Sequence, residues 1–321
     1  MRRMEKIAVL TSGGDSQGMN SAIRSVVRTG LAYGYEMIGI KRGYKGLIEN
    51  DFITLGSKDV SDILYRGGTF LQSARSEEFK TEVGQNKAVN NLKNHEINHL
   101  IVIGGDGSYR GAQSLLKQGI NTYGLPGTID NDIPLTDYTI GFDTTLNVIQ
   151  DAISNLRDTM SSHERVSVIE VMGRKCGDIA LQAGIASGVD AVLIPEFGYD
   201  MKAVASQLTQ GFERGKTHSI VMVAEGAGTA EEIAALIEQH SNLDTRPTVL
   251  GHIQRGGTPT AFDRLFTSRM GHKVIDLIHK GVTGVALGME KNEITYHTFD
   301  EIVQSENEID EKLYKMFHDL I

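Results

Sequence analysis

The chain has 321 residues, enough for one large domain or two smaller ones. Its 32 Lys and Arg against 41 Asp and Glu give a formal net charge of −9, which argues against a protein that binds nucleic acid or a membrane surface by general basicity. A single cysteine, Cys176, excludes an internal disulfide framework, and 36 glycines against only 5 prolines predict many tight turns in an ordered chain.

Short apolar runs alternate with helical periodicity along the chain. Strands are expected at Lys6–Thr11, Glu36–Lys41, His99–Ile103, Thr122–Leu125, Val166–Met172, Ala191–Pro195, Ser219–Ala224 and Thr248–His252. After the first strand, a helix is indicated by Met19, Ile23, Val26, Val27 and Leu31, and further helices are expected at Asp143–Met160, Ala203–Arg214, Ala230–His240 and Thr260–His279. The pattern predicts an α/β fold with two Rossmann-like, doubly wound lobes of mostly parallel strands facing a central cleft.

The chain shows neither a signal-type hydrophobic region at its start nor an apolar stretch of about 18 residues. We therefore expect a cytoplasmic protein without membrane association. The single thiol, Cys176, has no identifiable His or Asn partner in the sequence, which favours a small buried side chain over a nucleophile.

Six expected strands run into glycine-bearing polar clusters. These clusters are Thr11–Asp15, Gly104–Ser108, Gly127–Asp132, Met172–Asp178, Glu225–Gly228 and Gly251–Gly257. In an open α/β sheet, ligands bind beyond the carboxyl ends of the strands, so the six clusters are expected at one cleft. Any single cluster is equally explained as a turn that closes a strand–helix unit, but turn chemistry alone does not explain all six.

The first two clusters have the composition of phosphate-binding turns, because glycine lets phosphate approach the backbone at a helix N-terminus. No Gly-Lys-Ser/Thr follows, so neither is a Walker A loop. Asp106 suits a phosphate site if Mg²⁺ lies between the charges. A helix cap is the alternative for Asp106, and for Asp15 a helix cap and a site role stay equally open.

The third cluster places two carboxylates, Asp130 and Asp132, within one loop. This arrangement suits one group that accepts a substrate proton and one that helps to place charge, with an Asx-turn as the alternative. Basic side chains in or next to loops indicate an anionic substrate with several phosphates, although any one alone is better explained by a surface ion pair. They are Arg75, Arg165, Arg174, Arg246, His252 and Arg255. Together these groups predict metal-assisted phosphoryl transfer from a nucleotide to a phosphorylated acceptor.

Over essentially its whole length the chain closely resembles bacterial phosphofructokinases. The resemblance is carried by Gly13–Asp15, Gly104–Ser108, Pro126–Asp132, Met172–Asp178 and Gly251–Gly257. It implies a glycolytic kinase that transfers the γ-phosphoryl group of ATP to the 1-hydroxyl of fructose 6-phosphate, giving fructose 1,6-bisphosphate and ADP. Asp130 would be the base, Thr128 would contact the transferred phosphate, and Asp106 would bind Mg²⁺ as cofactor.

The same resemblance implies further contacts. ATP would be held by Gly14, Tyr44 (beside the adenine), Arg75, Ser76, Gly105, Asp106, Gly107 and Ser108. The sugar phosphate would be held by Thr128, Ile129, Asp130, Met172, Gly173, Arg174, Glu225, His252, Ile253, Gln254 and Arg255. Arg75 and Arg174 would neutralise charge at the transferring group. Arg165 and Arg246 would come from a neighbouring subunit, so that a homotetramer would share its active sites between subunits.

Two glycines bear on the phosphoryl donor. Family members that use pyrophosphate are expected to carry Asp where Gly107 stands and Lys where Gly127 stands, which favours ATP here. The rivals are a pyrophosphate-dependent phosphofructokinase, a kinase of the NAD-kinase or lipid-kinase type, and a catalytically silent sensor of nucleotide or sugar phosphate. Asp130–Asp132 with His252–Arg255 argue against the second, and the presence of Asp106 and Asp130 argues against the third.

The family's effector site for ADP or phosphoenolpyruvate is matched only in part. Its expected positions are Arg24, Arg28, Ser57, Arg157, Asp190, Arg214, Lys216, Thr217 and His218. Ser57 and Thr217 stand where cations are usual, and each lost charge-assisted contact is typically worth about 1.5–3 kcal/mol, so both effectors are expected to act weakly. Gln17 replaces a proline of the first loop. The lobes are expected at 1–139 plus 252–304 for nucleotide and 140–251 plus 305–321 for sugar phosphate.

Overall fold

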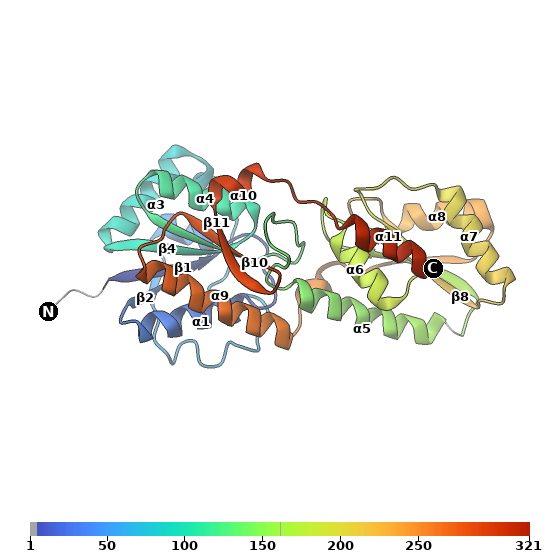
Figure 1. The fold of residues 1–321 in the computed structure, drawn as a ribbon, viewed down its shortest axis with the longest axis horizontal. Coiled ribbons are helices and arrows are strands. Elements are labelled where there is room, and N and C mark those ends of the chain that lie inside the picture. Colours follow the sequence, from blue (N-terminus) through green and yellow to red (C-terminus); the bar gives the residue numbers. More distant parts are fainter. Residues whose placement is uncertain (1–4, 161) are drawn as a thin grey trace. The chain divides into compact units, whose positions relative to one another are not determined.

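The computed structural model describes residues 5–160 and 162–321, which form two units (Figure 1). Unit 1 comprises Met1–Thr144 and Arg255–Asn307, and unit 2 comprises Thr145–Gln254 and Glu308–Ile321. The predicted limits at residues 139, 251 and 304 fall five, three and three residues before those of the units. No helix in the described part of the chain is both long enough and apolar enough to span a membrane.

Unit 1 is built on a seven-stranded sheet in the order β11-β10-β5-β4-β1-β2-β3. Its strands are β1 (Lys6–Thr11), β2 (Glu36–Ile40), β3 (Phe52–Thr54), β4 (Ile97–Gly104), β5 (Asn121–Pro126), β10 (Val285–Glu290) and β11 (Glu293–Thr298). The five inner strands are parallel, and β3 and β11 pair antiparallel at the two edges. The apolar strands β1, β4 and β5 therefore lie side by side at the centre, buried on both faces, as expected for a parallel sheet.

Helices cover both faces of this sheet. Helices α1 (Met19–Ala32) and α9 (Ala261–His279) pack on one face, and the other carries α2 (Gly43–Glu49), α3 (Glu82–Asn94), α4 (Asp106–Lys117) and α10 (Phe299–Gln304) (Figure 1). Two apolar cores result, one on each side of the strands. This arrangement confirms the α/β fold with a doubly wound sheet that the strand–helix alternation predicts.

Unit 2 contains a four-stranded parallel sheet in the order β7-β8-β6-β9. Its strands are β6 (Arg165–Val171), β7 (Ala191–Leu193), β8 (His218–Ala224) and β9 (Thr245–Val249). Its helices are α5 (Phe142–Met160), which begins in unit 1, α6 (Asp178–Ser187), α7 (Met201–Glu213), α8 (Ala230–Ser241) and α11 (Glu311–Leu320). A capping box fixes the start of α8, where the Thr229 side chain accepts from the Glu232 N–H and the Glu232 carboxylate accepts from the Thr229 N–H.

The last strand of unit 2 differs from its predicted position. The sequence favours Thr248–His252, but β9 spans Thr245–Val249 and a short 3₁₀ turn occupies Gly251–Arg255. Pro247 weakens the strand signal because proline cannot donate to a sheet ladder. The structure accommodates it because β9 is the edge strand and pairs only with β6.

A buried carboxylate holds the segment where the chain leaves unit 1. Asp263, in the first turn of α9, is fully buried and accepts hydrogen bonds from the Gly141 and Thr144 backbone N–H groups, both at 3.0 Å, and from the Thr144 hydroxyl. Burial raises the pKa of Asp263 to about 6, although the hydrogen bonds lower it. The last unit 1 residue before the crossing, Thr144, is therefore fixed by α9.

The raised pKa of Asp263 predicts a pH dependence of stability. The folded protein holds this proton between about pH 3.8 and pH 6 while the unfolded chain has lost it, so the contribution to stability is full below that range and is lost as the pH rises through 6. Relative to Asp263→Asn, the wild type should gain about 1 kcal/mol of unfolding free energy on going from pH 7 to pH 5. Denaturant unfolding of both proteins at the two pH values measures this difference, and parallel pH profiles would contradict it.

Candidate active site

The three glycine turns of unit 1 meet at one edge of its sheet. They follow β1, β4 and β5, which are neighbours, and backbone hydrogen bonds join them there. The Ser12 N–H donates to the Ile103 carbonyl at 2.9 Å, and the Gly127 N–H donates to the Gly104 carbonyl at 3.1 Å. The predicted meeting of these turns beyond the carboxyl ends of the strands is thus present within unit 1.

The first turn has one glycine in the left-handed region and a second glycine whose backbone is covered by a guanidinium. Gly13 has a φ of 87°, and its carbonyl accepts a hydrogen bond from the Ser73 hydroxyl at 2.5 Å. A Cβ added to Gly14 would lie 2.7 Å from Nη1 of Arg255. The Arg255 guanidinium therefore lies directly over the backbone of the first turn, where it donates to the Asp15 carbonyl at 2.8 Å.

The second turn begins helix α4. A Cβ on Gly104 would lie 2.5 Å from the Ser12 carbonyl oxygen, so this glycine permits close approach of the first two turns. Gly105 precedes the helix, and the Ser108 and Tyr109 N–H groups donate to its carbonyl. Gly107 differs, because a Cβ placed there would meet no atom within 4 Å. The start of α4 thus presents backbone N–H groups and a helix N-terminus beside open space, which suits an anion.

Asp106 is the first residue of α4. It does not cap the helix, because Gly105 occupies the cap position and the helix has no side-chain cap hydrogen bond. Its side chain is 49% exposed and forms an ion pair with Arg110 one turn later, at 3.0 Å. Among the described residues, no group of three or more His, Cys, Asp or Glu side chains could form a protein cage for a metal ion. One accessible carboxylate beside a phosphate-binding turn does fit Mg²⁺, which commonly takes one or two carboxylates and completes its shell with phosphate oxygens and water.

The third turn carries the buried carboxylate Asp130. Asp130 is 0% exposed, and the hydroxyl of the buried Thr128 accepts the Asp130 backbone N–H at 3.2 Å. Asn131 adopts a φ of 51°, and the Asn307 side chain donates to its carbonyl. These contacts hold the Asp130 backbone in place next to the two phosphate-type turns.

Tyr44 lies inside unit 1 and is only 6% exposed. Its ring stacks on Phe79 with 4.0 Å between ring centroids, and its hydroxyl donates to the Ser108 carbonyl at 2.6 Å. A Cβ on Gly111 would lie 2.7 Å from the Tyr44 ring, so the absence of a side chain at Gly111 admits this ring. Burial raises the pKa of Tyr44. The adenine contact expected for Tyr44 stays a prediction.

Arg75 and Ser76 lie nearby on the surface of unit 1. Both line a small cavity of about 180 Å³ together with Lys45, Ile48, Glu49, Glu77 and Glu78. The Ser76 hydroxyl accepts the Phe79 N–H at 3.2 Å, which ties this segment to the partner of the Tyr44 ring. Arg75 therefore directly precedes the residue that is hydrogen-bonded to Phe79.

Unit 2 has a second cluster at the carboxyl ends of its strands. Gly173 and Arg174 follow β6 with φ values of 134° and 54°, a conformation that is unusual for arginine. The Glu225 carboxylate, just after β8, accepts the Arg174 N–H at 2.8 Å. A Cβ on Gly226 would lie 2.0 Å from the Arg174 carbonyl oxygen, so this glycine makes room for the turn. The surrounding contacts thus hold Arg174 in a strained backbone state, which is common at functional sites.

The turn after β9 joins this cluster. Gln254 is fully buried, and its side-chain oxygen accepts the Met172 N–H at 3.1 Å, whereas the neighbouring His252 and Ile253 are exposed. Met172, Gly173, Arg174, Glu225 and Gln254 are therefore brought together as a group. Cys176 is buried, as expected for a small buried side chain.

Arg165 and Arg246 lie elsewhere in unit 2. Both are near the amino ends of β6 and β9, where Asp244 pairs with Arg246 at 2.9 Å and with Arg165 at 3.8 Å. Because β6 runs from Arg165 to Val171, this pair lies about 20 Å along the strand from the Met172 turn. One unit 2 cannot bring both ends of its sheet to one small ligand.

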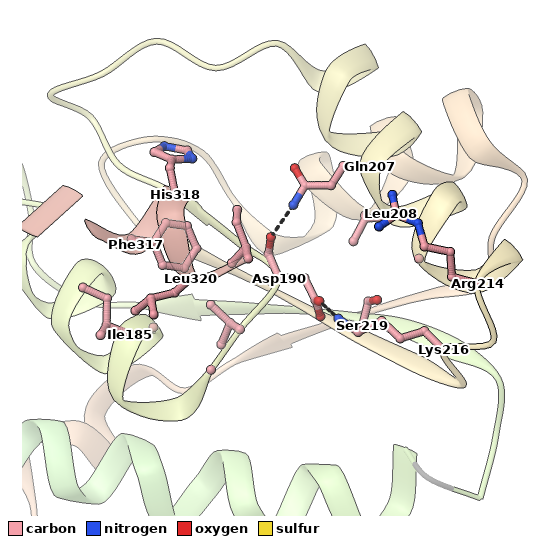
Figure 2. A pocket seen from close by; sticks show the side chains of 15 residues that line it. Ile185, Asp190, Gln207, Leu208, Arg214, Lys216, Ser219, Phe317, His318 and Leu320 are labelled. Atoms are coloured by element: carbon pink, nitrogen blue, oxygen red, sulfur yellow. Dashed lines mark hydrogen bonds and ion pairs between the residues drawn. The ribbon is translucent and has the colours of Figure 1, made fainter. Parts of the chain in front are cut away.

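A cavity of about 680 Å³ also lies in unit 2. Figure 2 shows Asp190, Arg214 and Lys216 on its polar side and Phe317 and Leu320 of α11 on the other. The Asp190 carboxylate accepts from Lys216 and from the Ile220 N–H, and the Asp190 carbonyl accepts from Gln207. Three expected effector-site residues therefore line one cavity. The wall from α11 was not predicted, although the strongly amphipathic 311–320 segment is a signal that could have indicated it.

The remaining effector-site positions are spread over both units. Arg157 donates to the Ser187 and Gly188 carbonyls, and the Thr217 hydroxyl contacts the His218 ring at 3.3 Å. In unit 1, burial and the neighbouring Arg28 lower the pKa of Arg24, whereas Ser57 is exposed. Two cations thus stand one helical turn apart on α1, and a bound anion would reduce the repulsion between them.

Comparison with known proteins gives a consistent result. The sequence matches the phosphofructokinase family over residues 6–278. It is 53% identical over 317 residues to the ATP-dependent 6-phosphofructokinase of Shouchella clausii (strain KSM-K16), covering 99% of each chain, and 54% identical over 314 residues to that of Paenibacillus macquariensis, covering 98% of each. The structure of phosphofructokinase from Saccharomyces cerevisiae has a TM-score of 0.89 and 35% identity, over 94% of this chain but only 45% of the yeast chain. The pyrophosphate-dependent phosphofructokinase of Marinobacter aquaeolei shares the fold, with a TM-score of 0.84, 19% identity and coverage of 96% and 86% of the two chains.

Proposed function

The chain belongs to the phosphofructokinase family, and we propose that it is an ATP-dependent 6-phosphofructokinase of glycolysis that works in the cytoplasm. The reaction transfers the γ-phosphoryl group of ATP to the 1-hydroxyl of fructose 6-phosphate. The observation that carries the proposal is the fully buried Asp130 beside two glycine turns that open onto the N-terminus of α4. A base next to a polyphosphate site is what such a transfer requires.

We assign nucleotide binding to unit 1. Gly14, Gly105, Gly107 and Ser108 would contact the phosphates of ATP, and Tyr44, Arg75 and Ser76 would contribute to the rest of the nucleotide site. Asp106 would hold the Mg²⁺ that accompanies ATP, as its accessible carboxylate at the start of α4 permits. When bound, the metal ion neutralises negative charge on the phosphates.

Asp130 would accept the proton of the sugar 1-hydroxyl as the hydroxyl oxygen attacks the γ-phosphorus. The bond between the γ-phosphorus and the β,γ-bridging oxygen would break, and ADP would leave with that oxygen. The hydrogen bond from the Asp130 backbone N–H to the Thr128 hydroxyl restrains the backbone that carries this carboxylate. Thr128 itself would contact the transferred group. Arg75 and Arg174 would neutralise the charge on that group. Most of the rate acceleration would then come from positioning and charge stabilisation.

We assign the sugar phosphate to Met172, Gly173, Arg174, Glu225, His252, Ile253 and Gln254 of unit 2, with Thr128, Ile129, Asp130 and Arg255 of unit 1. Arg165 and Arg246 lie at the opposite end of their sheet, so we infer that they serve the site of a neighbouring copy. This inference supports a homotetramer in which the active sites are shared. A homotetramer whose subunits lack Arg165 or Arg246 would bind the sugar phosphate weakly.

A coupled assay of ADP release tests the function. Fructose 6-phosphate and MgATP should give rapid turnover, and pyrophosphate in place of ATP should give none. Turnover only with pyrophosphate would point to the other donor class, and tight substrate binding without turnover would point to a silent sensor.

We further propose that the 680 Å³ cavity binds the phosphate of ADP or phosphoenolpyruvate weakly. Arg214 and Lys216 supply positive charge, but Lys216 is already paired with Asp190, and Ser57 and Thr217 add none. An incoming anion must compete with Asp190 for the Lys216 ammonium group. This competition supports weak regulation by both effectors.

The competition predicts the behaviour of Asp190→Asn. Wild-type enzyme should show at most a small rightward shift of its fructose 6-phosphate curve with phosphoenolpyruvate. The asparagine variant releases Lys216, so the concentration of phosphoenolpyruvate that gives a half-maximal effect should fall about tenfold. A strongly sigmoidal wild-type curve shifted by micromolar phosphoenolpyruvate would contradict the proposal of weak regulation.

A further inference from the structure

Gln17 is a buried polar residue in the loop between β1 and α1, and its side chain is 0% exposed. Its amide nitrogen donates to the Gly256 carbonyl at 2.6 Å. A buried amide that donates to a backbone carbonyl restrains the relative position of two segments, because separating them breaks that hydrogen bond. The two segments here are 239 residues apart in the sequence.

Gly256 directly follows Arg255, and Arg255 makes the reciprocal contact. Its guanidinium donates to the Asp15 carbonyl at 2.8 Å, two residues before Gln17. The two hydrogen bonds therefore run in opposite directions between the same pair of turns. Together they clamp the first glycine turn against the Arg255–Gly257 turn.

Other contacts confine the clamped turns from the outside. A Cβ on Gly67 would lie 2.4 Å from the Gly257 carbonyl oxygen, and the Asn20 amide donates to the Gly67 carbonyl at 3.2 Å. A Cβ on Gly141 would lie 2.9 Å from the Gln17 carbonyl oxygen. The backbone is thus closely packed at Gln17 and at the Gly257 carbonyl, whereas Gly256 is exposed, so we expect the loss of the Gln17 amide to be absorbed mainly at Arg255 and Gly256.

We propose that Gln17 is a positioning residue that sets the orientation of Arg255 for the sugar phosphate and couples that arginine to the nucleotide turn. A guanidinium has five N–H donors, so the bond to Asp15 leaves others for a phosphate in a two-point contact. Because Arg255 lies on the Gly14 backbone, its placement and that of the first phosphate-binding turn depend on each other. The inference rests on the proposed role of Arg255 in binding fructose 6-phosphate.

Three variants test the proposal. Gln17→Met keeps the length of the side chain and removes its amide, Arg255→Ala removes the guanidinium, and Gln17→Met/Arg255→Ala combines them. Gln17→Met should raise KM for fructose 6-phosphate about tenfold and change kcat less, because a lost buried hydrogen bond is worth about one such factor. In the Arg255→Ala background, Gln17→Met should add no further increase of KM.

The matched control is Thr122→Val. Thr122 is fully buried, and its hydroxyl donates to the Ala112 carbonyl at 3.1 Å, so the variant also loses one buried hydrogen bond in unit 1. It should lower the unfolding temperature as Gln17→Met does and leave KM unchanged. If Gln17→Met lowers only the unfolding temperature, or if its effect on KM adds to that of Arg255→Ala, the positioning role is wrong. If Arg255→Ala itself leaves KM unchanged, the proposed role of Arg255 fails, and the positioning role falls with it.

Discussion

Replacing Asp130 by serine should lower kcat by about 100- to 10,000-fold, the range expected when a general base is removed. The loss should fall on kcat rather than on substrate binding, because the carboxylate is proposed to act on the hydroxyl proton and the phosphates of both substrates are assigned to other groups. Serine fits the buried position without leaving a charge there. Steady-state kinetics and calorimetric binding of fructose 6-phosphate to the variant measure the two quantities separately.

A carboxylate in the same loop provides the control. Asp137 is exposed and accepts the Lys291 N–H at 2.7 Å, so Asp137→Ser removes a carboxylate and a hydrogen bond without touching the proposed site. Its kcat should stay within about twofold of wild type, as for most surface changes away from a site. A near-normal rate for Asp130→Ser would show that another group accepts the proton.

The positions of the central strands could be predicted from the sequence because each is a mostly apolar run that leads into a glycine-bearing turn. Lys6–Thr11 matches β1 at both ends, and the run at His99–Ile103 lies within β4. A parallel strand buried on both faces needs apolar side chains throughout, so its sequence signal is local and strong. The turns that follow these strands could be placed for the same reason.

The contacts that shape the turns could not be predicted, because they join distant segments. The Arg255 guanidinium lies over the Gly14 backbone, and the two residues are more than 200 positions apart in the sequence. Asp263 has the position of an N-terminal acidic residue in an amphipathic helix, yet it is fully buried against Gly141 and Thr144. Only the fold determines which backbone N–H groups lie opposite such a side chain.

The charged residues show the same division. The sequence indicated the cations Arg214 and Lys216, but it did not indicate that the Asp190 carboxylate forms an ion pair with Lys216. Residue type and spacing likewise did not separate Arg165 and Arg246 from Arg174, because all three are arginines next to strand ends, and only the family resemblance assigned the first two to a neighbouring subunit. Which end of a strand a residue occupies depends on the strand limits, and Pro247 obscured those of β9.

Gly107→Asp should abolish the use of ATP while leaving the fold intact. A side chain at this position meets open space, since an added Cβ has no atom within 4 Å, so the unfolding temperature should change little. The new carboxylate would stand in the first turn of α4, where the nucleotide phosphates are proposed to bind. Neighbouring negative charges repel strongly in a partly buried site. We expect kcat/KM for MgATP to fall at least about 100-fold, which corresponds to roughly 3 kcal/mol.

Two further variants separate the effect of the added charge at residue 107 from the effect of added volume and from steric strain at Gly127. Gly107→Asn adds the same volume without the charge, so its loss should be much smaller than that of Gly107→Asp if repulsion is the cause. Gly127→Lys should instead destabilise the protein, because a Cβ there would lie 2.9 Å from the Met19 side chain and 3.1 Å from the Gly104 nitrogen. Equal losses for the aspartate and asparagine variants would mean that space, not charge, admits ATP at this glycine. The two glycines that the family resemblance links to the choice of ATP thus differ physically, because Gly107 is open to a side chain and Gly127 is closed by packing.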